Sequence, residues 1–391
     1  MFVAIGILMS IFALLEITNM IKPKTKIFYV FAGILLFMLC FRYGQGTDYN
    51  AYEVQYTSLN STSSLFINLL DHGELGWYVL LMSFKRLGCS FSVFLGILSF
   101  VMMASTIRVI NKYSPYRILS LLLFYPTFYL TYYYSAIRQG IVLSIFLGFG
   151  IQWLIEKKYI KYFIMVVVLL MLHASAVVLF IIPVALVFKD KRPAKYIIAA
   201  LGFMVVAGYT GILNSLAARF GIHPSYFTVS ISYMAILLRA ILFYIVHIMY
   251  KASRNELNAE NRIEDVMYYI YVVGFIMYIM FAFSGTLSQR MTMPMKGIEI
   301  ILIPMLAAKI NNYRKEGLIS RTKPFLYLGI GGSSILLVMA VVVLALDVEM
   351  VKNINSYLVQ GNYYDWVNVF NYPYVSVFNK EDIFKYISHF D

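Results

Sequence analysis

Long apolar runs, separated by short links rich in lysine and arginine, follow one another along nearly the whole chain. Of the 391 residues, 61% are hydrophobic and only 13% are charged. A water-soluble core cannot bury that much apolar surface, whereas a lipid bilayer can. The first run lacks a basic stretch and a cleavage pattern, so we expect a span and not a removable signal peptide. The sequence therefore predicts an all-α polytopic membrane protein with roughly 10–12 transmembrane helices, including a bent hairpin.

Several classes of protein are disfavoured by what the sequence lacks. Cys40 and Cys89 stand alone, without the spacing of a zinc site, and no phosphate-binding loop or dinucleotide fingerprint occurs. We therefore expect neither a metal nor a cofactor, and no ATP-driven pump. The net charge of +13 lies mainly in the short links, which is the positive-inside pattern and not a nucleic-acid surface.

The basic links predict the topology, because links rich in lysine and arginine stay in the cytoplasm. The links expected inside are residues 22–26, 111–117, 156–161, 189–195, 251–262 and 311–323. The segments expected outside are residues 42–74, the turn around Ser135, residues 214–230, residues 284–290 and the tail after Asp347. We expect one transmembrane domain over residues 1–346, with an external loop at 42–74, and an external, aromatic-rich tail over residues 347–391.

The apolar run between the links at 156–161 and 189–195 is expected to cross the membrane an even number of times. A single crossing would invert every later loop, including the basic links at 251–262 and 311–323. We therefore expect a helical hairpin that bends near the sequence LHAS, with His173 at or near the bend. Each arm of about 11–15 residues reaches only roughly 16–22 Å, so the hairpin is expected to be partly re-entrant or sheltered by other helices.

The same counting of crossings applies between the external loop at 42–74 and the cytoplasmic link at 111–117. Only one full transmembrane span fits between them. Residues 91–110 supply that span, and residues 75–88 are expected to form an amphipathic helix on the outer surface. This arrangement leaves Lys85 and Arg86 outside.

Cationic side chains gather at the outer level of this topology, where the positive-inside rule predicts few. Arg42 ends the second apolar run, Arg138 begins a helix that runs inward, and Arg290 is expected to begin another. Arg239 lies about eight residues inside its run, or roughly 12 Å deep. His173 is expected on the same side. Several arginines at one level suggest a site for a polyanion such as a diphosphate.

Plainer interpretations exist for each of these residues. Any one of the arginines at the ends of the runs can be an interfacial side chain that extends to the surface, and His173 can be an ordinary buried histidine. Arg239 is harder to explain that way, because a charge inside a membrane helix usually faces a polar partner. Lys296 and Glu299 are expected to form a local ion pair. Tyr132–Tyr134 fit an aromatic belt better than a surface for sugar stacking.

The external loop adds acidic and aromatic groups to the predicted site. Its glycines allow a tight turn, and Asp48 is then expected to lie close to Arg42. The second part of the loop holds Asp71, His72, Glu74 and Trp77. The alternative is an ordinary solvated loop.

Six short motifs together resemble the EpsG-like membrane proteins, part of the broad Wzy-type group of polysaccharide polymerases. The motifs, in chain order, are FRYGQGTDYNAY, GELGWYVL, SAIRQGIVLSI, LHASAVVLF, SQRM and NYPYVSVF. The resemblance implies a GT-C-like polymerase architecture in the plasma membrane, with an active site that faces outside. It also implies an enzyme that joins lipid-linked oligosaccharide repeat units into an exopolysaccharide or capsule-type polymer.

The resemblance and the residues together nominate the site. His173 and Asp48 are the candidates for the catalytic base, and His173 is favoured because a histidine ordinarily titrates near neutral pH. Arg138, Arg290, Arg42 and Arg239 are the candidates for diphosphate binding. Gln139, Tyr49, Tyr52 and Gln289 are the candidates for other substrate contacts. No metal is expected, because the arginines already supply positive charge.

The expected partners are an undecaprenyl-diphosphate-linked oligosaccharide, the bilayer and other proteins of polysaccharide assembly, with no nucleic acid. Two other functions stay open. A flippase or exporter of the same lipid-linked sugar also needs outer arginines, but it should carry charges along a path to the inner half. A membrane acyltransferase should place its histidine toward the cytoplasm. The tail is expected either to cap the cavity or bind glycan, or to be an anchored interfacial segment.

Overall fold

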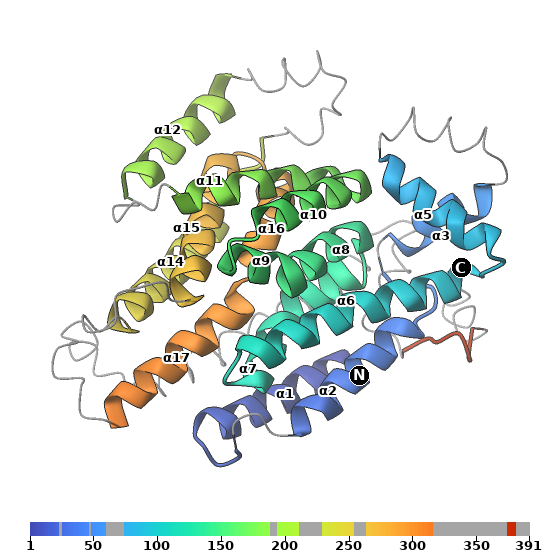
Figure 1. The fold of residues 1–391 in the computed structure, drawn as a ribbon, viewed down its shortest axis with the longest axis horizontal. Coiled ribbons are helices and arrows are strands. Elements are labelled where there is room, and N and C mark those ends of the chain that lie inside the picture. Colours follow the sequence, from blue (N-terminus) through green and yellow to red (C-terminus); the bar gives the residue numbers. More distant parts are fainter. Residues whose placement is uncertain are drawn as a thin grey trace. The chain divides into compact units, whose positions relative to one another are not determined.

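The computed structural model describes residues 1–22, 26–46, 48–59, 74–187, 194–210, 229–253, 263–315 and 374–380. Helices make up nearly all the regular structure of these ranges (Figure 1). The helices before residue 150 are α1 Phe2–Ile17, α2 Ile27–Cys40, α3 Tyr49–Ser58, α5 Leu75–Arg86, α6 Phe91–Tyr113, α7 Arg117–Phe124, η1 Tyr125–Tyr133, α8 Ile137–Ile145 and η2 Phe146–Gly150. Those that follow are α9 Ile151–Ile155, α10 Tyr159–Leu172, η3 Ala174–Phe180, α11 Ile181–Val187, α12 Ala194–Thr210, α14 Tyr233–Ser253, α15 Ile263–Phe281, α16 Gly285–Lys296 and α17 Glu299–Lys315.

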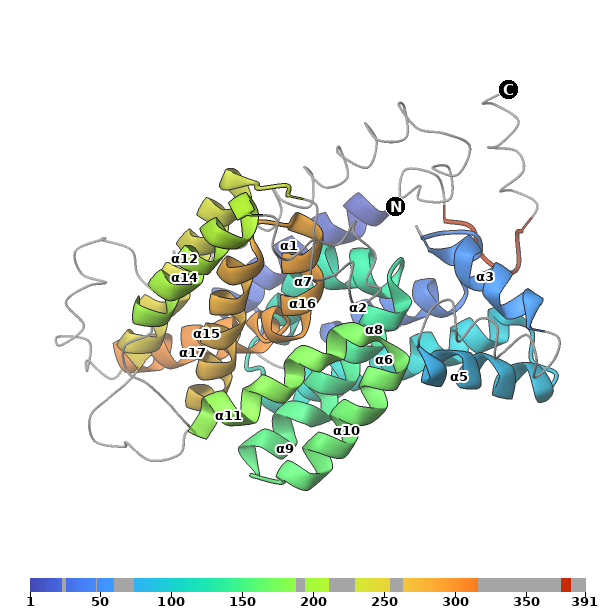
Figure 2. The same cartoon turned by 90° about the horizontal axis from the view of Figure 1, so that it is seen from above.

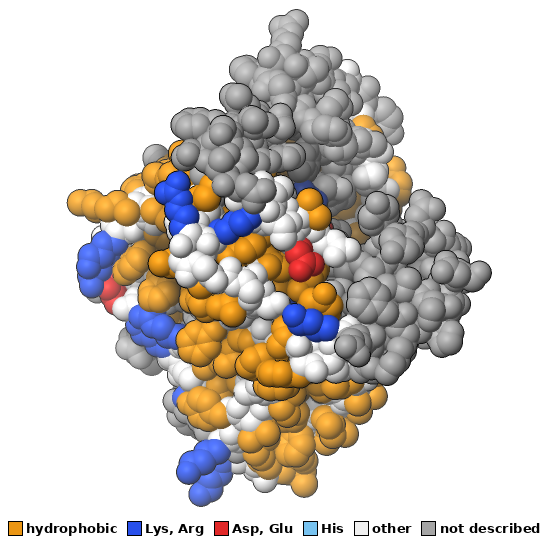
Figure 3. Space-filling view, turned by 90° about the vertical axis from the view of Figure 1, so that its right-hand side faces the viewer, with side chains coloured by type: hydrophobic (Ala, Val, Ile, Leu, Met, Phe, Trp, Pro, Cys, Tyr) orange, Lys and Arg blue, Asp and Glu red, His pale blue; other side chains and the backbone are white. Residues whose placement is uncertain are grey.

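The helices have the length and the apolar surface of a polytopic membrane protein. Four are long and apolar enough to cross a bilayer, namely Phe91–Tyr113, Ile137–Ile155, Tyr233–Ser253 and Ile263–Phe281. The pair α16 and α17, bent by 48°, makes a fifth if it is one broken span. On the face drawn in Figure 3, hydrophobic side chains predominate among the described residues, as in lipid-facing surfaces. The predicted all-α polytopic class is confirmed.

Five further apolar helices have only 10–17 residues, so the larger number of crossings expected from the sequence requires these helices to cross as well. They are Phe2–Ile17, Ile27–Cys40, Tyr159–Leu172, Ala174–Val187 and Ala194–Gly208. The predicted links at 189–195, 251–262 and 311–323, and the boundary at 346, fall wholly or partly outside the described residues.

The chain forms two compact units, and each has its own packing. The first comprises residues 1–149, 167–174 and 330–391, and the second comprises residues 150–166 and 175–329. In the first unit α1 packs on α7, α2 packs on α6 and α7, and α6 packs on α8 (Figure 2). In the second unit α15 contacts α11, α12, α16 and α17, and α14 contacts α17.

A buried carboxylate ties the end of α1 to the start of α7. The first N–H groups of a helix have no partner within the helix, and a negative charge is favourable at that end. Glu16, which is fully buried, accepts hydrogen bonds from the backbone N–H groups of Arg117 at 3.0 Å, Ile118 at 2.9 Å and Leu119 at 3.2 Å. Glu16 therefore caps α7 from a neighbouring helix.

The tyrosines before Arg138 are part of the protein core. Tyr132, Tyr133 and Tyr134 are buried, and they follow or belong to the π-helical segment η1. The Tyr134 hydroxyl donates to the Met38 carbonyl at 3.1 Å, and the Tyr133 and Thr106 hydroxyls lie 2.6 Å apart. The interpretation of these residues as an aromatic belt was wrong, because all three rings are buried among other side chains of the protein.

The predicted hairpin is present, and His173 lies at its bend. Helix α10 ends at Leu172, and the 3₁₀ helix η3 begins at Ala174. The Tyr162 hydroxyl donates to the Leu179 carbonyl at 2.8 Å across the two arms. Two residues 17 positions apart in a straight helix would be about 25 Å apart, so the chain must reverse between them.

Residues 75–110 divide as the sequence predicts. Helix α5 has 12 residues and ends at Arg86, and α6 then runs for 23 residues from Phe91. The Ser90 hydroxyl accepts from the Val93 N–H and caps α6. The position of α5 at the membrane surface stays a prediction.

The described part of the tail is attached to the end of α2. The Tyr43 N–H donates to the Val375 carbonyl, and the Val377 N–H donates to the Phe41 carbonyl, both at 2.9 Å. These bonds form an antiparallel bridge in which Arg42 faces Ser376. Residues 374–380 thus hold the segment that leads into the loop with Asp48.

Candidate functional site

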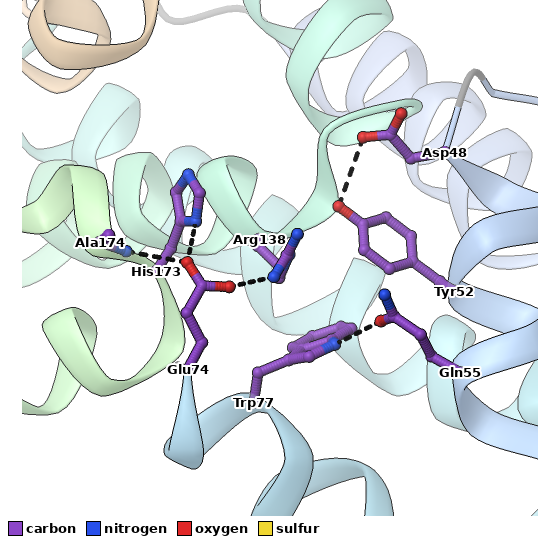
Figure 4. Close-up of polar contacts among 8 residues, drawn as sticks. All are labelled: Asp48, Tyr52, Gln55, Glu74, Trp77, Arg138, His173 and Ala174. Atoms are coloured by element: carbon purple, nitrogen blue, oxygen red, sulfur yellow. Dashed lines mark hydrogen bonds and ion pairs between the residues drawn. The ribbon is translucent and has the colours of Figure 1, made fainter. Parts of the chain in front are cut away.

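Glu74, Arg138 and His173 meet in the first unit, although they come from three separate elements (Figure 4). Glu74 is the N-cap residue of α5, Arg138 is the second residue of α8, and His173 is the bend of the hairpin. Glu74 Oε2 accepts from Arg138 Nη1. Glu74 Oε1 lies 2.7 Å from His173 Nδ1 and accepts from the Ala174 N–H at 3.0 Å. Two of the predicted site residues are therefore held by one carboxylate.

The surroundings of Glu74 favour its ionised form. Its exposed fraction is 8%, and burial by itself raises the pKa of a carboxyl group. The hydrogen bond and charge of His173, the charge of Arg138 and the Ala174 N–H outweigh the burial and lower the pKa of Glu74 below its ordinary value. The partial positive charge at the start of α5 acts in the same direction. The carboxylate is thus a stable anion between the Arg138 guanidinium and the His173 ring.

Arg138 lies between Glu74 and two aromatic rings. Its guanidinium carbon is 5.6 Å from the centre of the Tyr52 ring and 6.0 Å from that of Trp77, within the range of cation–π attraction. Its Nε is buried and has no hydrogen-bond partner among the described residues. The side chain is 23% exposed, so the guanidinium keeps donor capacity and access for an anion.

His173 turns one ring nitrogen toward Glu74 and the other away from it (Figure 4). Its side chain is 12% exposed. Because Nδ1 is engaged by the carboxylate, Nε2 is the ring atom available for proton transfer. A carboxylate–imidazole pair of this kind orients a general base.

Two glycines allow the close contacts that bring these elements together. A Cβ on Gly76 would lie 2.8 Å from the Cβ and carbonyl oxygen of Met171, so α5 meets the end of α10 there without room for a side chain. Gly46 has φ of +118° and packs on the Tyr134 carbonyl, at the turn just before Arg138. A side chain at either position would separate elements that carry site residues.

Asp48 lies near the cluster through Tyr52, which is buried. The Tyr52 hydroxyl donates to Asp48 Oδ2 at 3.5 Å, and burial raises the pKa of Tyr52 to about 12, so the hydroxyl stays protonated. Trp77 Nε1 donates to Gln55 Oε1 at 3.0 Å and fixes the neighbouring ring. Tyr49 and Gln139 are also buried in this unit, with little surface to offer a substrate.

Arg42 is not part of the Glu74 cluster. It is fully buried, donates to the Leu39 carbonyl at 3.0 Å and contacts the Ser99 hydroxyl at 3.5 Å. Its guanidinium carbon lies 4.9 Å from the centre of the Tyr134 ring. These contacts favour a structural role, and a role of Arg42 in diphosphate binding stays a prediction.

Arg239 and Arg290 belong to the second unit. Arg239 is buried and pairs with Glu299 at 2.5 Å, with its guanidinium carbon 5.6 Å from the centre of the Tyr271 ring. The ion pair of Glu299 is with Arg239 and not with Lys296, the partner expected from the sequence. Lys296 lies at the end of α16, before the bend, and its charge still interacts with that of Glu299.

The position expected for Arg290 needs correction as well. Helix α16 begins at Gly285 with Ser284 as its N-cap, so Arg290 is its sixth residue and not its first. Arg290 is half-buried and Gln289 is exposed. Their roles in substrate binding stay predictions.

Sequence reasoning gave Glu74 no role of its own. The signal was present in the motif GELGWYVL, where an acidic residue and a glycine precede an aromatic helix. The partners of Glu74 lie 64 and 99 residues away, which no local pattern reveals. Within the described ranges, no group of three or more His, Cys, Asp or Glu residues is placed to hold a metal ion.

Comparison with known proteins identifies a family for this chain. The model of the EpsG family matches residues 25–343, which is most of the chain and includes every residue of the cluster. Neither the curated proteins nor the solved structures give a match.

Proposed function

Because the chain belongs to the EpsG family, we propose that it is a membrane glycosyltransferase that polymerises lipid-diphosphate-linked oligosaccharide repeat units. The polymer is of the exopolysaccharide or capsule type, and the reaction takes place at the outer face of the plasma membrane. The family and the apolar helices support a membrane protein of exopolysaccharide synthesis. The observation that carries the enzymatic proposal is the convergence of Arg138 and His173 on Glu74.

Arg138 supplies the site for the leaving group. A guanidinium keeps its charge and presents donors that fit diphosphate oxygens. The start of α8, which carries Arg138, adds a partial positive charge that also attracts an anion. As the bond between the anomeric carbon and the diphosphate oxygen breaks, Arg138 stabilises the negative charge that develops on the lipid diphosphate. The diphosphate-binding roles expected for Arg290 and Arg239, which belong to the second unit, stay predictions.

His173 supplies the base. A hydroxyl of the acceptor sugar attacks the anomeric carbon, and Nε2 of His173 takes the hydroxyl proton. One bond between the acceptor oxygen and the anomeric carbon forms while the bond to the diphosphate breaks. With one positioned base and no covalent intermediate, direct displacement inverts the anomeric centre. Asp48, joined to the cluster through Tyr52, is the alternative base.

The test uses purified protein in lipid nanodiscs with lipid-diphosphate-linked repeat units, and polymer length as the measurement. Arg138→Ala should lower the rate by about 10²-fold or more, because one donor to developing charge is lost. His173→Gln should lower it by about 10²–10⁴-fold. Arg138→Lys separates charge from the fork geometry of arginine, since only the charge is kept.

Arg86→Ala is the matched control, because this arginine is exposed at the end of α5 and lies outside the cluster. It should polymerise like the wild type. Polymer of normal length from Arg138→Ala or His173→Gln, at matched protein amounts, would contradict the proposal. Translocation of the lipid-linked sugar across sealed vesicles without bond formation would favour a flippase instead.

A further inference from the structure

We infer that Glu74 is a positioning residue that fixes His173 with its proton on Nδ1 and makes Nε2 the proton acceptor, while the same carboxylate holds Arg138. This inference rests on the proposed function and assigns a role to a residue outside the predicted site. It also states which atom of the imidazole reacts.

The hydrogen-bond inventory of Glu74 determines the tautomer of His173. An ionised carboxylate accepts hydrogen bonds and donates none. Arg138 Nη1 and the Ala174 N–H are donors in every protonation state, and they occupy both oxygens of Glu74. The charge of Arg138 and these two hydrogen bonds favour the ionised carboxylate. Against an ionised carboxylate, the 2.7 Å contact with His173 Nδ1 places a proton on that nitrogen. The lone pair of a neutral His173 is then on Nε2.

The same geometry stabilises the product of proton transfer. Once Nε2 has taken a proton, the imidazolium faces the Glu74 carboxylate at hydrogen-bond distance. It also lies at the C-terminal end of α10, where the helix dipole favours a cation. Glu74 keeps its charge throughout, because the proton stays on the imidazole until it is released to solvent.

Glu74 also links the base to the anion site. Its Oε2 holds Arg138 and its Oε1 holds His173, so the two groups are set relative to each other by one side chain. Loss of the charge weakens the contacts with both groups. Glu74→Gln keeps the size of the side chain but replaces one acceptor oxygen by an amide NH₂ group. That group faces either Arg138 or the two donors at Oε1, which are His173 Nδ1 and the Ala174 N–H, so the amide cannot satisfy all three partners.

The spectroscopic test is the tautomer of His173 in ¹⁵N-histidine-labelled full-length protein in nanodiscs. The chain has five histidines, and the signal lost in His173→Gln identifies the one of interest. In the wild type at high pH, the protonated nitrogen should be Nδ1. In Glu74→Gln, the signal should shift to a mixture of the two tautomers. A wild-type spectrum with the proton on Nε2 overturns the inference, even if the variant does not fold.

The kinetic test is the pH profile of polymerisation. Glu74→Gln should lower kcat by about 10²-fold or more and change the acid limb of the pH profile, because the anion that stabilises the imidazolium is gone. Glu74→Asp keeps the negative charge. It should restore part of the polymerisation rate and leave the acid limb of the pH profile unchanged. A Glu74→Gln variant with unchanged kcat and an unchanged profile overturns the inference.

The two tests separate this inference from the proposed function. If no variant and no wild-type sample polymerises, the proposed function fails, while the tautomer measurement still decides the role of Glu74. If the wild type polymerises and the tautomer is insensitive to Glu74→Gln, the positioning role fails and the polymerase proposal stands.

Discussion

Glu74 Oε1 lies 2.7 Å from His173 Nδ1, although 99 residues separate the two along the chain. The pair depends on where α5 begins and where α10 ends. A close contact lies beside this pair: Gly76, two residues after Glu74, packs directly on the backbone and Cβ of Met171, two residues before His173. Packing of backbone on backbone therefore controls the geometry of the polar cluster.

Gly76→Ala should disable the site without removing a polar group. The new Cβ would lie 2.8 Å from the Met171 Cβ and carbonyl, so α5 must move away and Glu74 with it. We expect polymerisation to fall by about 10-fold or more, since small displacements of catalytic groups are costly. The measurement is polymer length from reconstituted protein, together with the His173 nitrogen shifts.

Gly33→Ala is the control for a glycine replacement in a helix. Gly33 lies in α2 with no atom within 4 Å of the added Cβ, and alanine favours helix by about 1 kcal/mol over glycine. This variant should be as active as the wild type and equally or more stable. Equal activity of the two glycine variants would mean that the contact between Gly76 and Met171 does not determine the geometry of the site.

The ion pairs of Glu74 should make stability depend on pH in the acid range. The pKa of Glu74 in the folded protein is below the ordinary 4.5, despite the opposing effect of burial, because of His173, Arg138 and the Ala174 N–H. The stabilisation is therefore complete above about 4.5 and is lost as the pH falls through the lower folded value. The difference in melting temperature between wild type and Glu74→Gln should be large near pH 6 and shrink in acid. A difference that stays constant down to pH 3 would contradict the assignment.

The features that could be predicted from the sequence are those that depend on a local sequence pattern or on the requirement to cross a bilayer. The hairpin followed from counting crossings, and Tyr162 with Leu179 shows that the arms do meet. Arg138 was nominated because a charge at the start of an apolar helix is unusual. Pairing between separate elements was not predicted: Glu299 forms its ion pair with Arg239 of α14, and the Tyr134 hydroxyl donates to the Met38 carbonyl. Such choices depend on packing, which no single run of sequence encodes.

Glu16→Ala should destabilise the first unit without touching the site. The substitution leaves the backbone N–H groups of Arg117, Ile118 and Leu119 without their acceptor in a buried place. We expect a loss of about 2 kcal/mol or more in the free energy of unfolding, because buried donors left unpaired are expensive. Glu156→Ala is the control, since Glu156 is exposed and its pair with Lys158 should contribute about 0–1 kcal/mol. Equal melting temperatures for the two variants would rule out the cap.

The proposed outward orientation of the site predicts an asymmetry in chemical labelling. In a background where Cys40 and Cys89 are replaced by serine, single cysteines are introduced at Leu87, which is 76% exposed after α5, and at Lys158, whose side chain is 51% exposed. A membrane-impermeant maleimide applied to intact cells should label Leu87→Cys at once and Lys158→Cys only after permeabilisation. The reason is that residues 156–161 form a basic link, which the positive-inside rule keeps in the cytoplasm. Labelling of Lys158→Cys in intact cells would place this link outside and, with it, reverse the side on which the hairpin presents His173.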